Sequence, residues 1–432
     1  MLAKLRYGID SELTLDLKAD ALVAHCDAPR GEPLDDLAAA LRAALEQPLD
    51  FPPLARSVVP GDKVAIALDH AVPQGALLIA GIVDVLQAAG IEPCDITIVR
   101  TPADETDGAG DPRALLAADI RSQVHLRSHD PANRDELSYL AASASGKPIY
   151  LDRAICEADV VIPVVVARLS ASLGDTGPAA RVLSAFSDEH FTQRYRAPRL
   201  LDSARRREKL RALADEVNWL LGVLFAVEVV PGGGQDLLHI VAGRSDLVFA
   251  RSQQLCEAAW SFRVPHRASV VVAAVEGDAG SQTWENLARA LWAASQAVTS
   301  DGAIAVCTDL AAELGPGTQQ LCNADDVEHV LREIGRERPV DSLVAAELAQ
   351  AIERGPLYLI SRLDDALLED LGIAHVGSDA ELARLVSRHD SCILLANAQH
   401  AVARPQKETD TNSNPKSESR SSDFLLNAET RP

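Results

Sequence analysis

The chain has 432 residues and a mass of 46.0 kDa, which suggests two or three domains, and its 47% hydrophobic and 24% charged residues are ordinary for a folded protein. Acidic residues outnumber Lys and Arg by 63 to 41, and a formal charge of −22 argues against binding of nucleic acid through a basic surface. No run of about 18 apolar residues and no apolar signal core are present, so we expect no membrane contact and no secretory signal.

The predicted elements alternate between short apolar strands and longer amphipathic helices. The predicted strands are Val64–Leu68, Ile96–Val99, Val160–Val166, Ser269–Val275, Ala303–Cys307, Leu357–Ile360 and Ile393–Ala396. The predicted helices are Leu77–Ala89, Glu285–Val298, Asp326–Ile334, Ser342–Glu353 and Asp379–Arg388. This alternation is typical of an α/β, Rossmann-like protein with mainly parallel sheets flanked by helices.

The chain divides near a strong turn signal, Pro231-Gly232-Gly233-Gly234. Before it, Leu200–Val227 reads as one long helix, and after it a short strand, Leu237–Val241, is predicted. The strand and helix pattern restarts near Arg267. We therefore predict two domains with a ligand cleft between them.

The predicted domain boundaries are 1–265 and 266–400. Residues 401–432 are rich in Ser, Thr, Asn, Glu and Lys, and we expect a disordered tail there. Seven Cys are spread along the chain without a C-x-x-C pair, which favours reduced thiols in a cytoplasmic protein over disulfides or a zinc site.

Candidate site residues come first from the strand ends, because ligands of parallel sheets bind beyond the carboxyl ends of the strands. Asp69 and His70 follow the predicted strand Val64–Leu68, and a carboxylate with an imidazole there can orient a ligand or transfer a proton. The alternative is a loop-capping Asp69 beside a surface His70.

Three further motifs have a functional and a structural interpretation. Gly232–Gly234 can wrap a phosphate, but its spacing favours a hairpin turn. His129, before a predicted helix Asp135–Ala141, reads more simply as a hydrogen-bonded turn residue. Asn286 and Arg289 share a helix face, where Arg289 can hold a carboxylate or form an ordinary surface salt bridge.

Several segments, taken in order, resemble the nickel-pincer lactate racemase family, also called 2-hydroxyacid racemases. The segments are Leu5-Arg6-Tyr7-Gly8, Gly61–Asp69 followed by Pro73, Ala88–Ile91, Ser128-His129-Asp130, Gly146–Arg153, Glu157–Ile162, Trp284–Leu291 and Asp301–Ile304. The resemblance covers most of residues 5 to 400. It implies a nickel pincer tethered to a lysine, a histidine ligand to nickel, and two histidines that act as acid and base on the hydroxyl.

The chain departs from that family's pattern at the positions that carry this chemistry. The arginine of the family's D-x-T-R-P motif falls at Val72, and the segment after Ile96–Val99, beginning Arg100-Thr101-Pro102, contains no histidine. Ser170 stands where a histidine is expected and Ala180 where the lysine is expected, with Arg181 beside it. There is no Lys between Lys147 and Lys209.

These departures favour a diverged relative that binds a small anionic, hydroxy acid-like ligand without the pincer, metal or another cofactor. Its expected ligand-binding residues are Asp69, His129, Asn286, Arg289, Arg100 and Arg181. The first alternative is an active 2-hydroxyacid racemase or epimerase with a rearranged site, for which His70 and His190 are the catalytic candidates. The second is a non-catalytic partner of an active paralogue, and homo-oligomers stay open.

Overall fold

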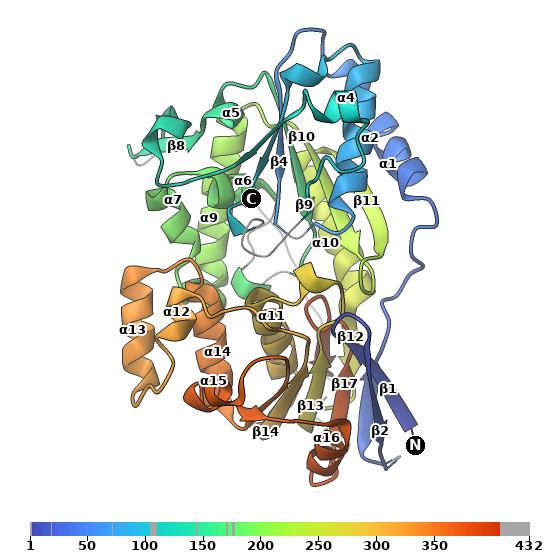
Figure 1. The fold of residues 1–432 in the computed structure, drawn as a ribbon, viewed down its shortest axis with the longest axis vertical. Coiled ribbons are helices and arrows are strands. Elements are labelled where there is room, and N and C mark those ends of the chain that lie inside the picture. Colours follow the sequence, from blue (N-terminus) through green and yellow to red (C-terminus); the bar gives the residue numbers. More distant parts are fainter. Residues whose placement is uncertain are drawn as a thin grey trace, which may run out of the picture.

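The computed structural model describes residues 2–18, 20–70, 72–103, 110–143, 146–169, 172–174 and 178–406. The chain forms two lobes, one above the other in Figure 1, and each lobe is built around a six-stranded sheet. The predicted α/β class, with two domains of mainly parallel strands flanked by helices, is confirmed. Among the described helices, none is long and apolar enough to cross a membrane.

The sheet of the upper lobe has the strand order β11-β10-β9-β4-β5-β6, in which only β10 and β11 pair antiparallel. Its strands are β4 (Val64–Leu68), β5 (Ile96–Arg100), β6 (His125–Ser128), β9 (Val160–Val166), β10 (Phe225–Pro231) and β11 (Leu237–Arg244). The chain adds strands on one side of β4 and then, from β9, on the other. In such sheets the crevice beside this reversal is the usual ligand site.

Helices cover both faces of the upper sheet, and the alternation along β4 decides which residues face which helix. Ile66 packs with Leu41 of α1 (Leu37–Glu46) and Ile79 of α2 (Gly75–Ala88). The small Ala67 faces the other way, toward Phe186 of α6 (Pro178–Phe186). Because both faces are covered, all five residues of β4 are buried.

Two longer helices complete the upper lobe. Helix α9 (Ala204–Leu220) packs on α6, and α10 (Ser245–Trp260) packs on β10 and β11. The turn between β10 and β11 is closed by the N–H of Gly232, which donates to the carbonyl of Asp236 at 2.7 Å. The hairpin reading of Gly232–Gly234 is therefore confirmed.

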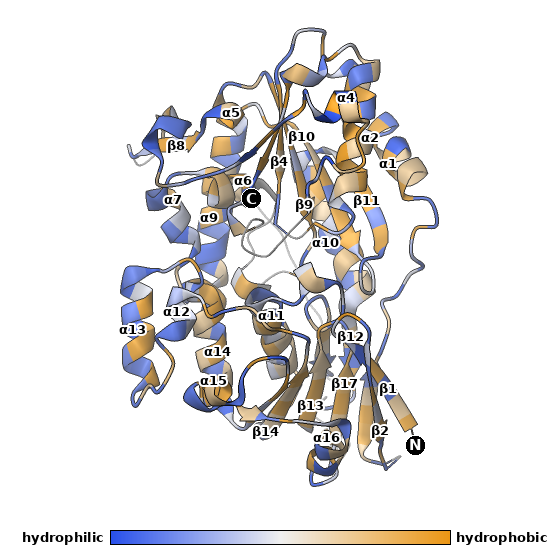
Figure 2. Cartoon of the chain, in the orientation of Figure 1, coloured by the Kyte–Doolittle hydropathy of each residue, from blue (hydrophilic) through white to orange (hydrophobic). Residues whose placement is uncertain are grey.

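The sheet of the lower lobe is parallel throughout and has the order β16-β15-β14-β13-β17-β3. Its strands are β3 (Leu22–Cys26), β13 (Ala268–Ala274), β14 (Val298–Cys307), β15 (Leu357–Ile360), β16 (Ala374–His375) and β17 (Cys392–Leu395). The order reverses between β13 and β17. Figure 2 shows β13, β14 and β17 as hydrophobic, whereas α13 (Val327–Glu337) has a hydrophilic side.

Both faces of the lower sheet are covered as well. Helices α11 (Trp284–Ser295) and α14 (Ser342–Arg354) contribute to the core on one face. On the other face, α16 (Asp379–Val386) and the hairpin of β1 (Leu2–Tyr7) and β2 (Ser11–Asp16) cover the strands. Residues 2–26 therefore pack with the lower lobe, although the predicted first domain, 1–265, includes them.

Three other predictions differ from the structure. The expected helix Leu200–Val227 is instead α8 (Arg199–Asp202), α9 and the start of β10. The expected helix Asp135–Ala141 is a short 3-10 turn followed by β7 (Leu137–Ala142), which pairs with β8 (Pro148–Asp152).

The third difference concerns the tail. Residues 402–405 form β18 (Val402–Pro405), which pairs with β12 (Ser261–Val264), and the rest of the expected tail, 407–432, lies outside the described residues. All seven cysteines are free, as predicted.

Candidate functional site

A cavity of about 230 Å³ lies where the carboxyl ends of the two sheets meet. The upper lobe lines it with residues at the carboxyl ends of β4 and β5, including Asp69, His70 and Arg100. The lower lobe contributes Asp278 and Ser281, which follow β13. The reversal in the upper sheet lies at this cavity, as expected for a ligand site in a doubly wound sheet.

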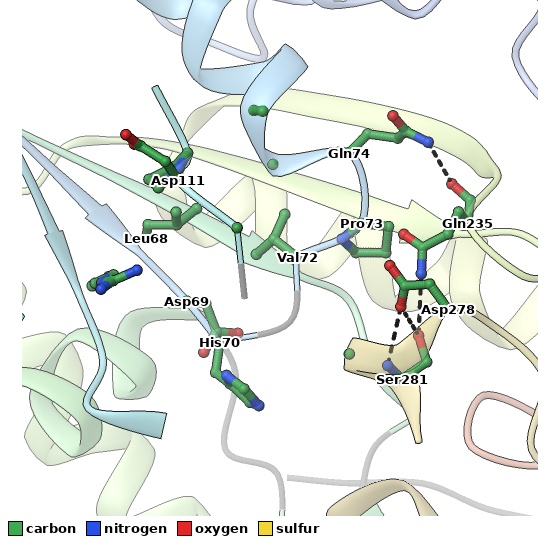
Figure 3. Close-up of a pocket in the computed structure, with 16 residues that line it drawn as sticks. Leu68, Asp69, His70, Val72, Pro73, Gln74, Asp111, Gln235, Asp278 and Ser281 are labelled. Carbon is green, nitrogen blue, oxygen red and sulfur yellow. Dashed lines mark hydrogen bonds between the residues drawn. The ribbon is translucent and has the colours of Figure 1, made fainter. Parts of the chain in front are cut away.

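A chain of hydrogen bonds joins the two lobes along one side of this cavity (Figure 3). Gln74, just before α2, donates from Nε2 to the carbonyl of Gln235 at 3.3 Å. Gln235 in turn donates from Nε2 to Oγ of Ser281 at 3.1 Å, and that hydroxyl donates to Asp278 at 3.0 Å. The cavity wall is therefore shared between α2, the β10–β11 turn and the lower lobe.

A buried ion pair lies beside the cavity. The guanidinium of Arg181, on α6, donates to a carboxylate oxygen of Asp69. Asp69 is placed by its own backbone, because its N–H donates to the carbonyl of Val164 at 2.9 Å and so extends the ladder between β4 and β9. Both side chains are about nine-tenths buried, so the pair is shielded from water.

A second ion-pair network crosses from one lobe to the other. Arg168 follows β9 in the upper lobe, and its Nη1 lies 3.4 Å from Oε1 of Glu285 in the first turn of α11. Arg289, one helical turn further along α11, donates from Nη2 to the same oxygen at 2.6 Å. Arg168 and Arg289 are 15% and 6% exposed, so the two cations lie largely away from bulk water, whereas Glu285 is 36% exposed.

These charges change one another's protonation. Burial, together with the positive charges of Arg181 and Arg289, lowers the pKa of Arg168 to about 10. Arg168 therefore stays cationic at neutral pH. Burial alone raises the pKa of Glu285, but Arg289, Arg168 and His70 outweigh it, and the pKa of this carboxyl lies well below its usual range. Glu285 is accordingly an anion at neutral pH.

His400 lies near the same two arginines. It follows β17, at the point where the strand order of the lower sheet reverses. Its ring packs against Trp260, with centroids 5.6 Å apart. Burial and the charges of Arg168 and Arg289 lower the pKa of His400 to about 3, so this imidazole is neutral at physiological pH.

The structure brings most of the predicted residues to one place. Asp69, His70 and Arg100 line the cavity, while Arg181 contacts Asp69. Figure 3 shows His70 projecting away from α2. The remaining two are on α11: Arg289 belongs to the cross-lobe network, and Asn286 positions the cavity wall, because its Nδ2 donates to the carbonyl of Ser281 at 2.9 Å.

Two predicted residues lie elsewhere. His129 is 2% exposed, and its ring nitrogens contact Asp152 at 3.2 Å and the carbonyl of Ser187 at 3.0 Å. His129 is thus a hydrogen-bonded turn residue. Both of its ring nitrogens contact other groups of the protein, so neither is available to a ligand. His190 lies on α7 (Glu189–Tyr195), beside a different pocket lined by Tyr150 and Arg134.

The residues at the expected attachment point do not fit a lysine-tethered pincer. Ala180, at the lysine position, is fully buried on α6, and its neighbour Arg181 is engaged with Asp69. A guanidinium stays protonated and is a poor nucleophile for a covalent link. Ser170, at the histidine position, lies outside the described residues, and the described parts of the chain hold no group of three or more His, Cys, Asp or Glu arranged for a metal.

Sequence reasoning missed Arg168, Glu285 and His400. Arg168 follows the correctly predicted strand Val160–Val166 by two residues, so the strand-end rule that selected Asp69 was a usable signal for it. His400 directly precedes the expected disordered tail, so no sequence pattern pointed to it. The strand that follows it, β18, pairs with β12, which is far away in the sequence.

Comparison with known proteins supports the fold. The profile of the lactate racemase N-terminal domain matches residues 7–169. No curated protein sequence matches the chain.

Two solved structures resemble the whole chain. The lactate racemase apoprotein from Thermoanaerobacterium thermosaccharolyticum aligns with a TM-score of 0.74 at 15% identity, over 94% of this chain and 100% of that one. A protein from Thermotoga maritima aligns with a TM-score of 0.62 at 11% identity, over 87% and 99% of the two chains. The chain is thus similar to the lactate racemase N-terminal domain through residues 7–169, and along most of its length it shares the two-lobed fold of these two solved structures.

Proposed function

We propose that this protein binds a small, hydroxy acid-like anion between its lobes, and that it does so without a lysine-tethered nickel pincer. The observation that carries the proposal is the cross-lobe network, in which Arg168 and Arg289 approach one carboxylate oxygen of Glu285. With Arg181 and Asp69 beside it, three arginines meet two carboxylates among the described residues. The excess of positive charge favours an anion.

Arginine suits this task for a physical reason. Its planar guanidinium stays charged when buried and binds a carboxylate through two parallel hydrogen bonds. Lobes that each supply one arginine are also drawn together by an anion placed between them. The proposed ligand therefore contacts Arg168 and Arg289, with Asp69 and His70 on the upper wall of the adjoining cavity.

The test is calorimetric titration of the full chain with lactate and with glycolate, both of which carry one carboxylate and one hydroxyl. The variant Arg289→Met keeps an apolar stem of similar length but removes the charge. We expect it to weaken binding by roughly 10- to 100-fold, because a hydrogen bond to a charged group contributes about 1.5–3 kcal/mol.

The matched control is Arg332→Met, which removes an arginine from the exposed side of α13. We expect unchanged affinity in that variant. Equal affinity of the wild-type chain and Arg289→Met for both anions contradicts the proposed site. Absence of binding by the wild-type chain contradicts the proposed function itself.

The second candidate is a 2-hydroxyacid racemase with a rearranged site, and the observation in its favour is His70 at the cavity, close enough to act on Glu285. Racemisation needs a proton-transfer group on each face of the alcohol carbon. Incubation of the purified chain with L-lactate, followed by chiral chromatography, separates the candidates. Accumulation of D-lactate that is lost in His70→Asn favours the racemase, whereas unchanged L-lactate favours binding alone.

Under either candidate function we place the protein in the cytoplasm, since all seven thiols are free.

A further inference from the structure

Helix α9 has one buried face and one exposed face. It packs beside α6 (Figure 1), and Leu210, Ala214 and Val217 contribute its buried face to a core that includes Leu183 of α6. The residues of the opposite face are exposed and recur every three or four positions, which places them on one stripe of the helix. They are Arg205, Glu208, Lys209, Ala212, Asp215 and Trp219.

The charges of α9 are divided between its two halves. All of its basic residues lie in the first half: Arg205, Arg206, Arg207, Lys209 and Arg211. The second half contains Asp215 and Glu216 and no basic residue. Within the described part of the chain, no ion pair engages Arg205 or Lys209.

This division does not stabilise the helix itself. The helix dipole favours acidic residues in the first turn and basic residues in the last turn, and α9 has neither. Arg205 and Arg206 in particular lie near its positive end. The charges therefore call for compensation from outside the helix, by a surface of the opposite polarity.

The last turn of α9 also exposes large apolar side chains. Trp219 is 76% exposed, and Leu224, which follows the helix, is 52% exposed. The helix ends because Gly222 adopts a left-handed φ of 68°, and the N–H of Val223 turns back to the carbonyl of Asn218 at 2.8 Å. An exposed tryptophan beside a charged stripe is typical of a protein interface, where Trp and Arg are enriched.

We propose that two copies of this chain form a dimer through α9, with the two helices antiparallel about a two-fold axis at Ala212. Arg205 and Trp219 each lie seven residues, close to two helical turns, from Ala212. The two-fold axis therefore brings Trp219 of one copy to Arg205 of the other, where the guanidinium can stack on the indole. The small side chain of Ala212 allows the helices to approach closely at the axis.

Charge complementarity selects a second copy as the occupant of this face. In an antiparallel pair the basic half of each helix lies against the acidic half of the other, so the same attraction occurs twice, as a two-fold interface requires. A parallel pair instead brings like charges together. The proposal is independent of the proposed ligand, because α9 contributes no residue to the lining of the cavity at Asp69.

The first experiment is sedimentation equilibrium of the full chain at concentrations from about 1 to about 100 µM. We expect a reversible dimer of twice the 46.0 kDa of the chain. Trp219→Ser is expected to raise the dissociation constant of the dimer by at least about tenfold. Val340→Ser, at another apolar residue that is 65% exposed, is the control and is expected to leave it unchanged.

A charge exchange tests the antiparallel arrangement. Arg205→Glu with Lys209→Glu makes α9 acidic throughout, and Asp215→Lys with Glu216→Lys makes it basic throughout. We expect each double variant to be monomeric alone and an equimolar mixture of the two to form a heterodimer, because opposite charges then face each other along the whole helix.

The matched control for the charge variants is Arg332→Glu with Arg336→Glu on α13, which is expected to dimerise as the wild type does. A wild-type chain that is monomeric at every concentration overturns the proposal. A wild-type dimer that survives both Trp219→Ser and the charge variants uses another face and overturns it as well.

A covalent trap tests the position of the two-fold axis. Ala212→Cys places two thiols beside the axis, and we expect diamide to join two chains through a disulfide that non-reducing electrophoresis detects above the wild-type background. In Ala204→Cys the two thiols are about 24 Å apart along the helices, so no such product is expected. Absence of the linked dimer in Ala212→Cys contradicts the proposed axis.

Discussion

Two clusters of buried charge in this protein are built on opposite plans. In the first, Asp152 is fully buried and contacts His129 and Arg127, all within the upper lobe. In the second, Arg168 of the upper lobe and Arg289 of the lower lobe share the carboxylate of Glu285. The first cluster closes on itself, whereas the second joins two bodies and lies beside a cavity.

The difference separates a structural role from a binding role. A satisfied cluster inside one lobe has no group to offer a ligand, and loss of one member leaves an uncompensated buried charge. A cluster with one cation from each lobe can exchange its internal partner for an external anion. Burial and charge alone therefore do not identify a binding site. The distinguishing feature here is that the charged partners come from different lobes.

The largest expected effect is on the stability of the closed cluster. In Asp152→Ala the buried His129 loses its carboxylate, half-buried Arg127 keeps only Glu136 at 2.8 Å, and the N–H of Ala154 loses its cap at 2.9 Å. We expect the free energy of unfolding to fall by about 3–5 kcal/mol, as measured by chemical denaturation. Asp325→Ala, at an exposed carboxylate, serves as the control and is expected to change it by less than about 0.5 kcal/mol.

Asp152→Ala also tests whether the two clusters have separate roles in stability and in binding. Lactate affinity of the folded Asp152→Ala chain is expected to equal that of the wild type, because the closed cluster does not line the cavity. A loss of affinity as large as the one expected for Arg289→Met contradicts the separation of the two roles.

A third buried carboxylate sharpens the comparison, because the positive charge of Arg354 does not outweigh its burial. Burial and the nearby Asp202 outweigh Arg354 and raise the pKa of Glu347, on α14, to about 8. The folded chain thus binds this proton more tightly than the unfolded chain does. Between the ordinary value of 4.5 and about pH 8, the free energy of unfolding therefore falls as the pH rises.

Glu347→Gln removes this titration while keeping the shape of the side chain. We expect it to stabilise the protein at about pH 9 relative to the wild type by an amount on the order of 2–4 kcal/mol greater than at about pH 5. Denaturation curves at both pH values measure the difference. Equal effects of the substitution at the two pH values contradict the raised pKa.

The smallest expected effect is on affinity and has the opposite sign to that of an arginine variant. Glu285→Gln removes the negative charge that competes with a bound anion for Arg168 and Arg289. We expect lactate to bind more tightly by about 1–2 kcal/mol, and more so at low ionic strength. Calorimetry at two salt concentrations measures this, and weaker binding in Glu285→Gln shows instead that the carboxylate is needed to position the arginines.

Much of the fold follows from local sequence patterns. The strands at Val64–Leu68, Val160–Val166 and Leu357–Ile360 agree with the structure to the residue, because each is a continuous apolar run between helices. The stretch from Leu200 was misread because a charged helix is followed at once by the apolar strand β10. The pairing of β3 with β17 links residues far apart in the sequence, and no local pattern encodes it.

Part of the candidate site can likewise be predicted from local sequence patterns. Asp69 is predictable because it directly follows a clear strand, and the structure pairs it with Arg181, a second predicted residue. The contact of Arg168 with Glu285 depends on how the two lobes meet, which no spacing within either lobe specifies. The lowered pKa of His400 comes from its burial and from Arg168 and Arg289, and it therefore arises only in the folded chain.

The most direct test of the central claim is the intact mass of the protein purified from its native host, together with its nickel content. We predict the mass of the unmodified chain and no stoichiometric nickel, because buried Ala180 and ion-paired Arg181 stand at the attachment point. A mass excess that corresponds to a covalent cofactor, with about one nickel per chain, contradicts the account. It establishes instead a pincer held by another residue.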